Sequence, residues 1–501
     1  MFRQAASPAV LHVGNIGNNA YQNARILNRE AIPSDVLCYD YYHAMGCPEW
    51  EDALVDRLPD SFDENKPEWH RLRLSDFERP DWFAQGPLRY AVAYLAARRT
   101  GRRMRARAWH GLIKSCCRIE SDAILTRRLA LFLDCLRRIR GFHGGSGLRS
   151  AVRRLLAGSD PLPPLPFRTV CEGCRTLFPD RPDSLVAADL AQYVPGVQLM
   201  GNCLSLYDIV LGYSTDCIYP LLAGHRCYFA YEHGTLRAIP FEDSPTGRLT
   251  ALAYRKAACV FITNCDNIRA AERLGLTNYR YIPHPINDRN LALADGTVLR
   301  CQLMERFRAD FIVFHPSRLH WEPELRHPSW EKGNDLFLRG FARFVRETAP
   351  RALCILARWG QKLRETDALL RDEGITGRVH WISPVPNRTM LGYVKAADAV
   401  ADQFWLGTFG GITPKALGCG RPTLLHLDPE VHRWCFPELP PVLNVRDPVQ
   451  ISAALASLYR DPAHAREIGA RSEAWYRTYH SESVVRDRLV SAIRECWRPG
   501  L

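Results

Sequence analysis

The chain has 501 residues, a mass of 57.0 kDa and a formal net charge of +12, with 47% hydrophobic and 24% charged residues. This length exceeds what one hydrophobic core normally serves, so we expect two globular domains. The sequence opens without a signal-peptide pattern, and no stretch reaches the roughly 20 apolar residues that span a bilayer. We therefore expect a cytoplasmic protein, either free or peripherally bound at the inner membrane face.

The N-terminal stretch AVLHVGNIGNNAYQNARILNREAIPSDVLCYD has a clear alternating pattern. Its hydrophobic periodicity indicates a buried strand, a glycine-containing turn, an amphipathic helix and a second strand. This βαβ order is typical of the start of a parallel, doubly wound sheet.

A strongly basic segment, residues 87–158, interrupts the alternation with helical patterns that contain repeated Arg pairs, and the proline-rich SDPLPPLPF ends it. From Arg89 to Arg154 there are 17 Lys and Arg against three Asp and Glu, so this part carries +14 and the rest of the chain −2. We interpret it as an inserted Arg-rich helical segment. It could bind an anionic membrane or glycolipid surface, form a solvated lid, or bind nucleic acid. Nucleic acid is the least expected, because no stacking platform or DNA-reading motif accompanies the charge.

Strand and helix patterns alternate again over residues 184–283, and a second such series runs from about residue 310 to 425. Two series joined by a polar linker predict an α/β protein with two facing Rossmann-like domains. We place the N-terminal domain at residues 1–290 and the C-terminal domain at residues 291–480. The remaining residues, 481–501, are expected to form a helix that packs back on the N-terminal domain.

Ligands of open α/β sheets bind beyond the carboxyl ends of the strands, so the loops after strands are the first candidates for a site. After the first strand, Gly14 and Gly17 are small enough to let backbone amides approach an anion. In the second half, Arg318 follows a strand and Lys332 precedes a helix, and two cations from one loop can neutralise a diphosphate. A tight turn and two solvated cations are the alternative interpretations.

A third loop, GTFGGITPKALGCGRP at residues 407–422, follows another strand. Gly410 and Gly411 expose amides at the expected start of a helix, where unpaired donors and the helix dipole favour negative charge. All three loops therefore suit an anionic ligand.

The C-terminal half resembles the nucleotide-sugar domain of group 1 retaining glycosyltransferases, which have the GT-B fold. The resemblance rests on a strand followed by Arg318, then Lys332-Gly333-Asn334-Asp335, then the stretch from Phe409 to Thr423. It covers residues 310 to about 480. It implies that the donor diphosphate is held by Arg318, Lys332, Gly410, Gly411, Ile412 and Thr413. Gly14 and Gly17 of the first loop are further candidates for the same diphosphate site.

The same resemblance implies that the nucleobase lies near Pro384 to Pro386. The sequence departs from the pattern of the group at two positions. The two glutamates that the group carries, eight positions apart, correspond here to Gly407 and Lys415. The second glutamate normally accepts hydrogen bonds from ribose hydroxyls, and an ammonium group has only donors. Asp402, at a probable strand end, is a candidate replacement carboxylate in the donor sugar and ribose region, and a buried structural role is its alternative.

The N-terminal half resembles the acceptor domain of that group more loosely, through its βα alternation and through YEHGTLR. The resemblance implies that His233, preceded by Glu232, points into the cleft near the sugar and takes part in catalysis. A neutral imidazole there can accept a hydrogen bond from a hydroxyl or position the acceptor. Arg237 and the pair His284-Pro285 are expected near the same seam.

Metal and redox chemistry are not expected. The 17 cysteines are scattered through strand-like and helix-like segments, which is typical of a reduced compartment. Cys171 and Cys174 form the one Cys-X-X-Cys motif, without a second pair at zinc-site spacing, and no Asp-X-Asp triplet occurs. We therefore expect no cofactor and no metal, with the nucleotide sugar acting as substrate.

The resemblance implies a metal-independent glycosyltransferase that moves a sugar from a nucleotide diphosphate to a glycan or lipid-linked acceptor, with retention. Two alternatives remain open. One is a non-catalytic nucleotide-sugar-binding or scaffold protein, since both glutamates are missing. The other is a sugar-nucleotide epimerase of the same fold, which would need acid and base carboxylates near the diphosphate.

Overall fold

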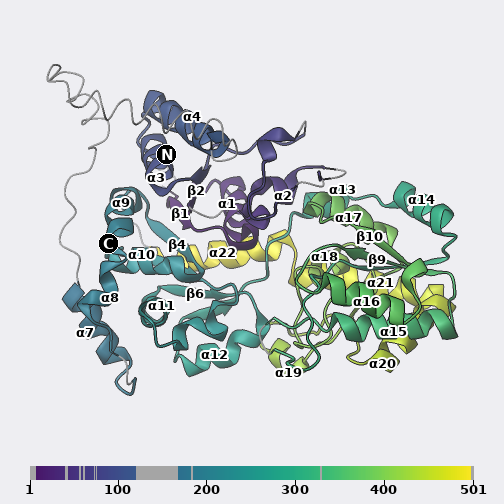
Figure 1. The fold of residues 1–501 in the computed structure, drawn as a ribbon. Helices are drawn as coiled ribbons and strands as arrows, with labels where there is room; N and C mark the ends of the chain where they lie inside the picture. Colours follow the sequence, from purple (N-terminus) through teal and green to yellow (C-terminus); the bar gives the residue numbers. More distant parts are fainter. Residues whose placement is uncertain are drawn as a thin grey trace, which may run out of the picture.

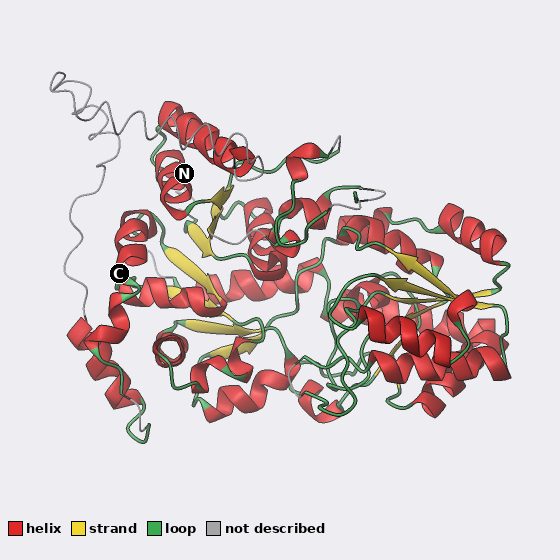
Figure 2. Cartoon of the chain, in the orientation of Figure 1, coloured by secondary structure: helices red, strands yellow, loops and turns green. Residues whose placement is uncertain are grey.

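The computed structural model describes residues 7–39, 43–55, 58–59, 62–72, 74, 76–119, 167–181, 184–327 and 330–497. These residues form two α/β domains that lie side by side (Figure 1). Each domain has a central sheet with helices on both faces (Figure 2). The two facing Rossmann-like domains predicted from the sequence are confirmed.

The N-terminal sheet has seven parallel strands in the order β3-β2-β1-β4-β5-β6-β7. The central strands are buried along their whole length, because helices cover both faces of the sheet. The strands are β1 (Val10–Val13), β2 (Ser34–Tyr39), β3 (Phe83–Gly86), β4 (Ile209–Tyr213), β5 (Tyr228–Tyr231), β6 (Cys259–Ile262) and β7 (Tyr279–Tyr281). The helices are α1 (Asn19–Arg29), α2 (Pro48–Asp52), α3 (Leu88–Arg99), α4 (Arg103–Ile119), α7 (Phe167–Leu177), α8 (Ala187–Ala191), α9 (Val194–Leu204), α10 (Ile218–Leu222), α11 (Pro245–Lys256) and α12 (Ile268–Arg273).

The C-terminal sheet has six parallel strands in the equivalent order, β10-β9-β8-β11-β12-β13. Its strands are β8 (Phe311–His315), β9 (Ala352–Ala357), β10 (Val379–Ile382), β11 (Ala399–Ala401), β12 (Thr423–Leu425) and β13 (Leu443–Asn444). Its helices are α13 (Asp288–Leu293), α14 (Thr297–Phe307), α15 (Asn334–Glu347), α16 (Leu363–Asp372), α17 (Asn387–Ala396), α18 (Thr413–Gly418), α19 (Pro429–His432), α20 (Pro448–Arg460) and α21 (Pro462–Tyr479). In both sheets the chain starts at the centre, winds to one edge and then returns to the other side, which creates a switch point between β1 and β4 and between β8 and β11.

The chain crosses between the domains twice. After β7 it enters the C-terminal domain, and after α21 it returns as α22 (Glu482–Cys496), which lies under α1 of the N-terminal domain (Figure 1). Val485 and Leu489 of α22 are buried in the same hydrophobic cluster as residues of α1. Glu482 at the start of α22 accepts a hydrogen bond from Arg25 at 2.8 Å, so an ion pair adds to this packing.

The basic segment is divided between core and surface. Ala91 and Leu95 of α3 are buried in the N-terminal core, so the part that begins at residue 87 covers the sheet instead of standing apart from it. α4 packs on α3 and exposes arginines on its outer side, whereas residues 120–166 lie outside the described residues. The edge strand β3 was not expected, because its sequence FAQG has no run of apolar residues.

None of the helices that the structure describes is both long and apolar enough to cross a membrane. Cys171 and Cys174 lie on α7, with both side chains in the N-terminal core. Their motif therefore contributes to packing.

Candidate functional site

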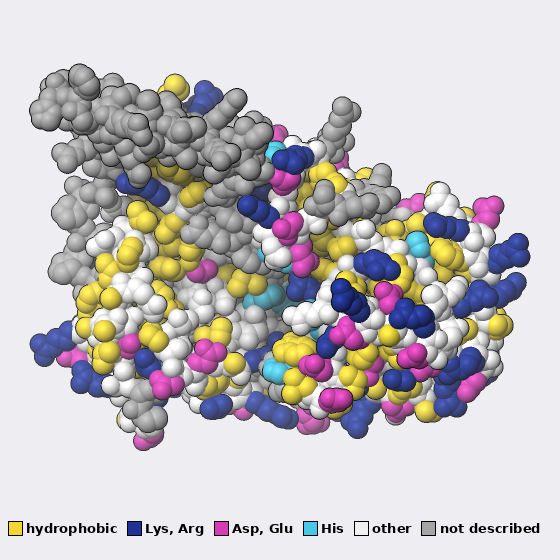
Figure 3. Space-filling view, viewed as in Figure 1, with side chains coloured by type: hydrophobic (Ala, Val, Ile, Leu, Met, Phe, Trp, Pro, Cys, Tyr) yellow, Lys and Arg dark blue, Asp and Glu magenta, His cyan; other side chains and the backbone are white. Residues whose placement is uncertain are grey.

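A cavity of about 800 Å³ lies between the two domains. Figure 3 shows histidine and basic side chains along the seam between the two lobes. Loops that follow β1, β5, β7, β8, β9, β10 and β11 contribute to its lining, so the carboxyl ends of both sheets meet there. Among the residues proposed from sequence, the cavity brings together Gly17, His233, Arg318, Lys332, Asp402, Gly410, Gly411, Ile412 and Lys415, with Arg237, His284, Pro285 and Pro384.

Asp402 organises the glycine-rich loop. Its carboxylate accepts hydrogen bonds from the Gly410 backbone amide at 2.7 Å, the Thr413 hydroxyl at 2.6 Å and the Ser317 hydroxyl at 3.0 Å. The side chain is buried, with 1% of its surface exposed. Because Ser317 follows β8 and the loop follows β11, one carboxylate joins the two loops at the switch point of the C-terminal sheet.

The two glycines of this loop have different roles. A Cβ on Gly410 would lie 2.8 Å from an Asp402 oxygen, so the contact with Asp402 requires glycine there. Nothing lies within 4 Å of a Cβ position on Gly411, which is exposed to the cavity. The helix that follows, α18, has only six residues, so its dipole is small and the cations nearby supply most of the positive potential.

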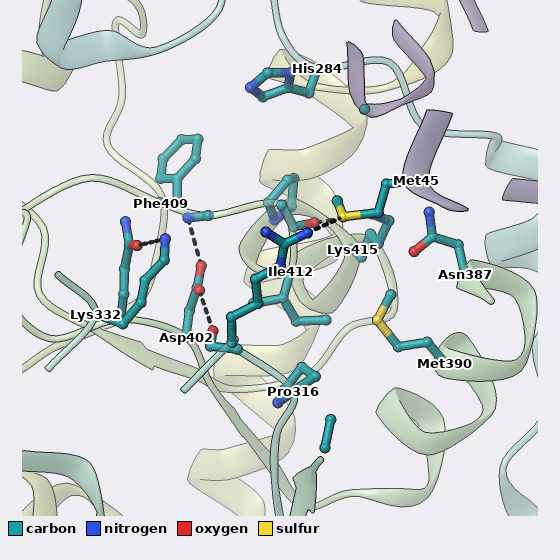
Figure 4. Close-up of a pocket in the computed structure, with 18 of the residues that line it drawn as sticks. Met45, His284, Pro316, Lys332, Asn387, Met390, Asp402, Phe409, Ile412 and Lys415 are labelled. Atoms are coloured by element: carbon teal, nitrogen blue, oxygen red, sulfur yellow. Dashed lines mark hydrogen bonds between the residues drawn. The ribbon is translucent and has the colours of Figure 1, made fainter. Parts of the chain in front are cut away.

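Three cations line the cavity and have no carboxylate partner among the described residues. Arg318 places its guanidinium 2.9 Å from the Met45 sulfur and 4.8 Å from the centre of the Trp359 ring. Lys332 donates to the Gln403 side-chain oxygen at 2.5 Å, and Lys415 Nζ lies 3.3 Å from the Gly411 carbonyl oxygen. Figure 4 shows Lys332 beside Asp402, with Lys415 on the other side of the pocket.

The positive charges in this cavity affect one another. Burial lowers the pKa of Lys332, and the charges of Arg237 and Arg318 lower this pKa further, whereas Asp402 opposes them. Arg237 itself is neutralised by Asp266, to which it donates two hydrogen bonds of 2.8 and 3.0 Å. An anionic ligand would relieve the repulsion among the other three cations.

Two neutral histidines line the N-terminal side of the cavity. Burial lowers the pKa of His233 to about 4, and burial also lowers the pKa of His284 well below its ordinary value. Asn19 joins them, with Nδ2 3.1 Å from His233 Nδ1 and Oδ1 3.2 Å from His284 Nδ1. An amide nitrogen only donates and an amide oxygen only accepts, so His233 carries its proton on Nε2 and His284 carries its proton on Nδ1. The pair therefore offers one donor and one acceptor at Nε2.

Four residues proposed from sequence lie outside the cavity lining. Glu232 is fully buried and accepts hydrogen bonds from the Thr263 amide at 3.2 Å and the Thr263 hydroxyl at 3.3 Å. A Cβ on Gly14 would collide with Asp216, so this glycine allows close packing at the carboxyl ends of the central strands β1 and β4. Thr413 faces Asp402, as described above.

Gly407 also lies outside the lining, at the position where the resemblance aligns a glutamate that faces the sugar. Its φ of +69° places it in the left-handed region, and its missing Cβ would lie 3.0 Å from Cβ of Asp428. The turn therefore directs this position towards Asp428 and away from the cavity.

The structure adds lining residues that the sequence did not suggest: Asn19, Met45, Trp50, Glu51, Trp359, Asn387 and Gln403. Gln403 directly follows Asp402 at a strand end, so its place in the loop was a usable signal. Met45, Trp50 and Glu51 belong to the polar stretch after β2, where no periodic pattern pointed to a site. Only the docking of this stretch on the C-terminal domain brings them to the cavity.

Comparisons with known proteins identify the fold. No protein-family model and no curated protein sequence matches the chain. Among solved structures, HepE from Anabaena in complex with UDP and glucose superposes with a TM-score of 0.50 at 16% identity, over 61% of this chain and 83% of that chain. The chain has the GT-B fold.

Two further solved structures superpose less closely. Sucrose-phosphate synthase from Thermosynechococcus elongatus has a TM-score of 0.47 at 15% identity, over 62% of this chain and 80% of that chain. A glycosyltransferase from Rickettsia africae has a TM-score of 0.44 at 10% identity, over 71% of this chain and 89% of that chain. The present cavity lies in the cleft between the two GT-B domains.

We expect Asp402→Ala to destabilise the C-terminal GT-B domain by about 3 kcal/mol, because three donors lose a buried acceptor. For a domain of this size the thermal midpoint should fall by roughly 6 to 12 °C. Differential scanning calorimetry measures this. Asp372→Ala, at the exposed end of α16, is the control and should change the midpoint by less than about 2 °C. An unchanged midpoint for Asp402→Ala would show that the carboxylate does not hold the loop.

Proposed function

We propose that this protein is a glycosyltransferase whose donor is a nucleotide diphosphate sugar. The observation that carries the proposal is the presence of Arg318, Lys332 and Lys415 in one interdomain cavity, without a carboxylate partner among the described residues. A diphosphate supplies the missing negative charge. The guanidinium of Arg318 can bind two of its oxygens in one plane, while the lysines act as point charges.

The same groups support bond cleavage. When the bond between the sugar carbon and the diphosphate oxygen breaks, negative charge grows on the departing diphosphate. Cations that are already in place stabilise this charge without reorganising, which is the electrostatic form of catalysis that needs no metal ion. Burial between two domains excludes water, which would otherwise take the place of the acceptor.

His233 and His284 support an acceptor role for the N-terminal side. Their two Nε2 atoms make no hydrogen bond with a described residue, and one donates while the other accepts. A sugar hydroxyl both donates and accepts, so it matches this pair. We propose a glycan or a lipid-linked glycan as acceptor, and retention of configuration follows from the resemblance of the C-terminal half to retaining enzymes.

The two alternatives make different predictions in one assay. A scaffold protein would bind a nucleotide sugar and release no nucleotide with any acceptor pool. An epimerase would change the sugar without an acceptor, but Asp402, one of the two carboxylates in the described lining, is occupied by the glycine-rich loop. Incubation with UDP, GDP, ADP and TDP sugars, followed by analysis of released nucleotide and of the sugar, separates the three activities.

Replacing Lys332 with alanine should weaken nucleotide diphosphate binding by about tenfold or more, because a charge-assisted contact is worth about 1.5 to 3 kcal/mol. Isothermal titration calorimetry with UDP, which the HepE structure contains, is the first measurement. Lys256→Ala is the matched control, since this lysine is exposed at the end of α11 and away from the cavity. Equal affinities for the wild type and Lys332→Ala would remove the central assignment.

We further propose that α4 contacts an anionic membrane or glycolipid surface. Arg102, Arg103, Arg105 and Arg107 are exposed and have no carboxylate partner among the described residues, and Met104 between them is 77% exposed. Cations near an anionic lipid surface gain about 1 kcal/mol each, and an exposed apolar side chain can enter the headgroup region. A lipid-linked acceptor would then lie at the same surface as the enzyme.

Vesicle co-sedimentation tests this contact. The protein should bind vesicles that contain phosphatidylglycerol and not vesicles of phosphatidylcholine alone. Arg103→Glu/Arg107→Glu should weaken binding by about tenfold or more. Arg371→Glu/Arg466→Glu changes the net charge equally at exposed positions of the C-terminal domain and should have a smaller effect. Equal losses for both pairs would indicate attraction by net charge and not a surface formed by α4.

A further inference from the structure

Glu51 is a carboxylate that reaches the cavity from the opposite domain. It belongs to α2 of the N-terminal domain, lines the cavity and is 6% exposed. Its Oε2 atom accepts a hydrogen bond of 2.5 Å from Asn387, the first residue of α17 in the C-terminal domain. The side chain therefore crosses the domain boundary.

The segment around Glu51 is held firmly on the C-terminal domain. Trp50 and Trp359 stack with ring centres 6.3 Å apart, and the Thr389 hydroxyl donates to the Val55 carbonyl oxygen at 2.7 Å. Asp52 accepts hydrogen bonds of 2.8 Å from Asn287 and from Asn290. Contacts on both sides of Glu51 thus fix its position at the edge of the cavity.

Electrostatics connect Glu51 to Lys415. Burial raises the pKa of Glu51. Among the groups that lower this pKa, the charge of Lys415 has the largest effect, followed by the hydrogen bond from Asn387 and then by the charge of Arg25. Asp52 is the carboxylate next to it in sequence and raises the pKa. Lys415 is therefore the cation that most favours the ionised form of Glu51.

Glu51 retains an acceptor that no described residue uses. Asp402 and Glu51 are the carboxylates in the described lining, and the glycine-rich loop occupies Asp402. The Oε1 atom of Glu51 accepts no hydrogen bond from a described residue. It is also not among the fully buried polar atoms that lack a partner, so a ligand can reach it. An ionised carboxylate oxygen can accept bonds from hydroxyl groups of a ligand.

The location of this acceptor in the cavity suits a contact with the ribose of a nucleotide. Pro384, Val385 and Asn387 line the cavity, and so does Lys415, which lies in α18 directly after the glycine-rich loop. Asn387 and Lys415 lie on the same side of the pocket, across from Lys332 and Asp402 (Figure 4). Glu51 accepts a hydrogen bond from Asn387, so its carboxylate lies at the Asn387 side of the pocket.

We propose that Glu51 binds the ribose hydroxyls of the nucleotide. The N-terminal domain would then supply the acceptor that a glutamate at the position of Lys415 supplies in the group that the C-terminal half resembles. The charge of Lys415 favours the ionised form of Glu51 against the effect of burial. This inference rests on the proposed function, because it requires a nucleotide in the cavity.

The proposed contact would join the two domains through the nucleotide. The diphosphate site belongs to the C-terminal domain, whereas Glu51 belongs to the N-terminal domain. Binding of the ribose therefore favours the arrangement in which the two domains are together. A bound nucleotide would therefore add one contact to those that already hold α2 against the C-terminal domain.

The test compares ribonucleotides with their deoxy counterparts by isothermal titration calorimetry. UDP, GDP and ADP are titrated beside the 2′-deoxy and 3′-deoxy forms of each. The wild type should bind one of the ribonucleotides about tenfold or more tightly than at least one of its deoxy forms, since a hydroxyl bonded to a carboxylate is lost. Glu51→Gln should weaken ribonucleotide binding about ten- to a hundredfold and reduce the discrimination to less than about threefold.

Glu49→Gln is the matched control. Glu49 is a buried glutamate of the same helix, its carboxylate pairs with Arg79 at 2.8 Å, and it does not line the cavity. This variant should lose thermal stability and keep the discrimination of the wild type. A loss of discrimination in both variants would mean that displacement of α2 is the cause, and would overturn the direct contact.

Transfer of the carboxylate provides a second test. In the Glu51→Gln background, Lys415→Glu should recover ribose discrimination, whereas Lys415→Gln should not. Failure of Lys415→Glu to recover discrimination would show that the two positions do not address the same hydroxyls, and would overturn the exchange that we propose.

The remaining outcomes separate this inference from the proposed function. Binding to the wild type without ribose discrimination overturns the ribose contact alone. Weaker binding of UDP-sugars by Glu51→Gln with unchanged binding of UDP would place Glu51 on the transferred sugar and also overturn it. If the wild type binds none of the nucleotides, the proposed function fails, and the ribose contact fails with it.

Discussion

The structure depends on holding three like charges in one cavity. Arg318, Lys332 and Lys415 repel one another, and the hydrogen bonds of each are made with neutral groups. Met45 and Trp359 support the guanidinium, and Gln403 supports Lys332. Neutral partners fix the geometry of a cation without cancelling its charge, so the potential stays available for a ligand. The free energy of folding of two large domains offsets the repulsion among these cations.

Asp402 shows how the charge is kept available. A carboxylate in this cavity would normally pair with a lysine, and its charge does raise the pKa of Lys332. Three hydrogen bonds from Ser317, Gly410 and Thr413 occupy its oxygens. The loop therefore uses the carboxylate for its own conformation, and the cations face the cavity.

The fold and the C-terminal loops could be predicted from the sequence because they depend on local patterns. Buried parallel strands appear as apolar runs, and the loops that follow them contain the cations and glycines. The sequence did not show where α3, which packs in the core, ends and where the exposed basic helix α4 begins, because both helices contain Arg pairs. β3 has too few apolar residues to stand out.

Parts of the site that depend on long-range contacts could not be predicted. Glu51 and Asn387 are 336 positions apart, and nothing in either local sequence indicates that they meet. The role of Asp402 was open between a ligand contact and a structural one, and only the placement of Gly410 and Thr413 distinguishes them. Similarly, the turn at Gly407 determines that this position faces Asp428.

The two chain crossings have a mechanical consequence. His480, at the second crossing, donates from Nε2 to the carbonyl oxygen of His284 at the first, over 3.2 Å, and Asp288 accepts from the Glu482 amide at 3.0 Å. These hydrogen bonds hold the two connecting segments together at one point, which makes this point a hinge. Sliding one domain along the other would stretch one of the two segments. We therefore expect rotation about this point to be the easiest relative motion of the two domains. His284 makes one of these contacts and also lines the cavity, so we expect the wall near His284 to move less than the parts of the cavity farther from the two crossings.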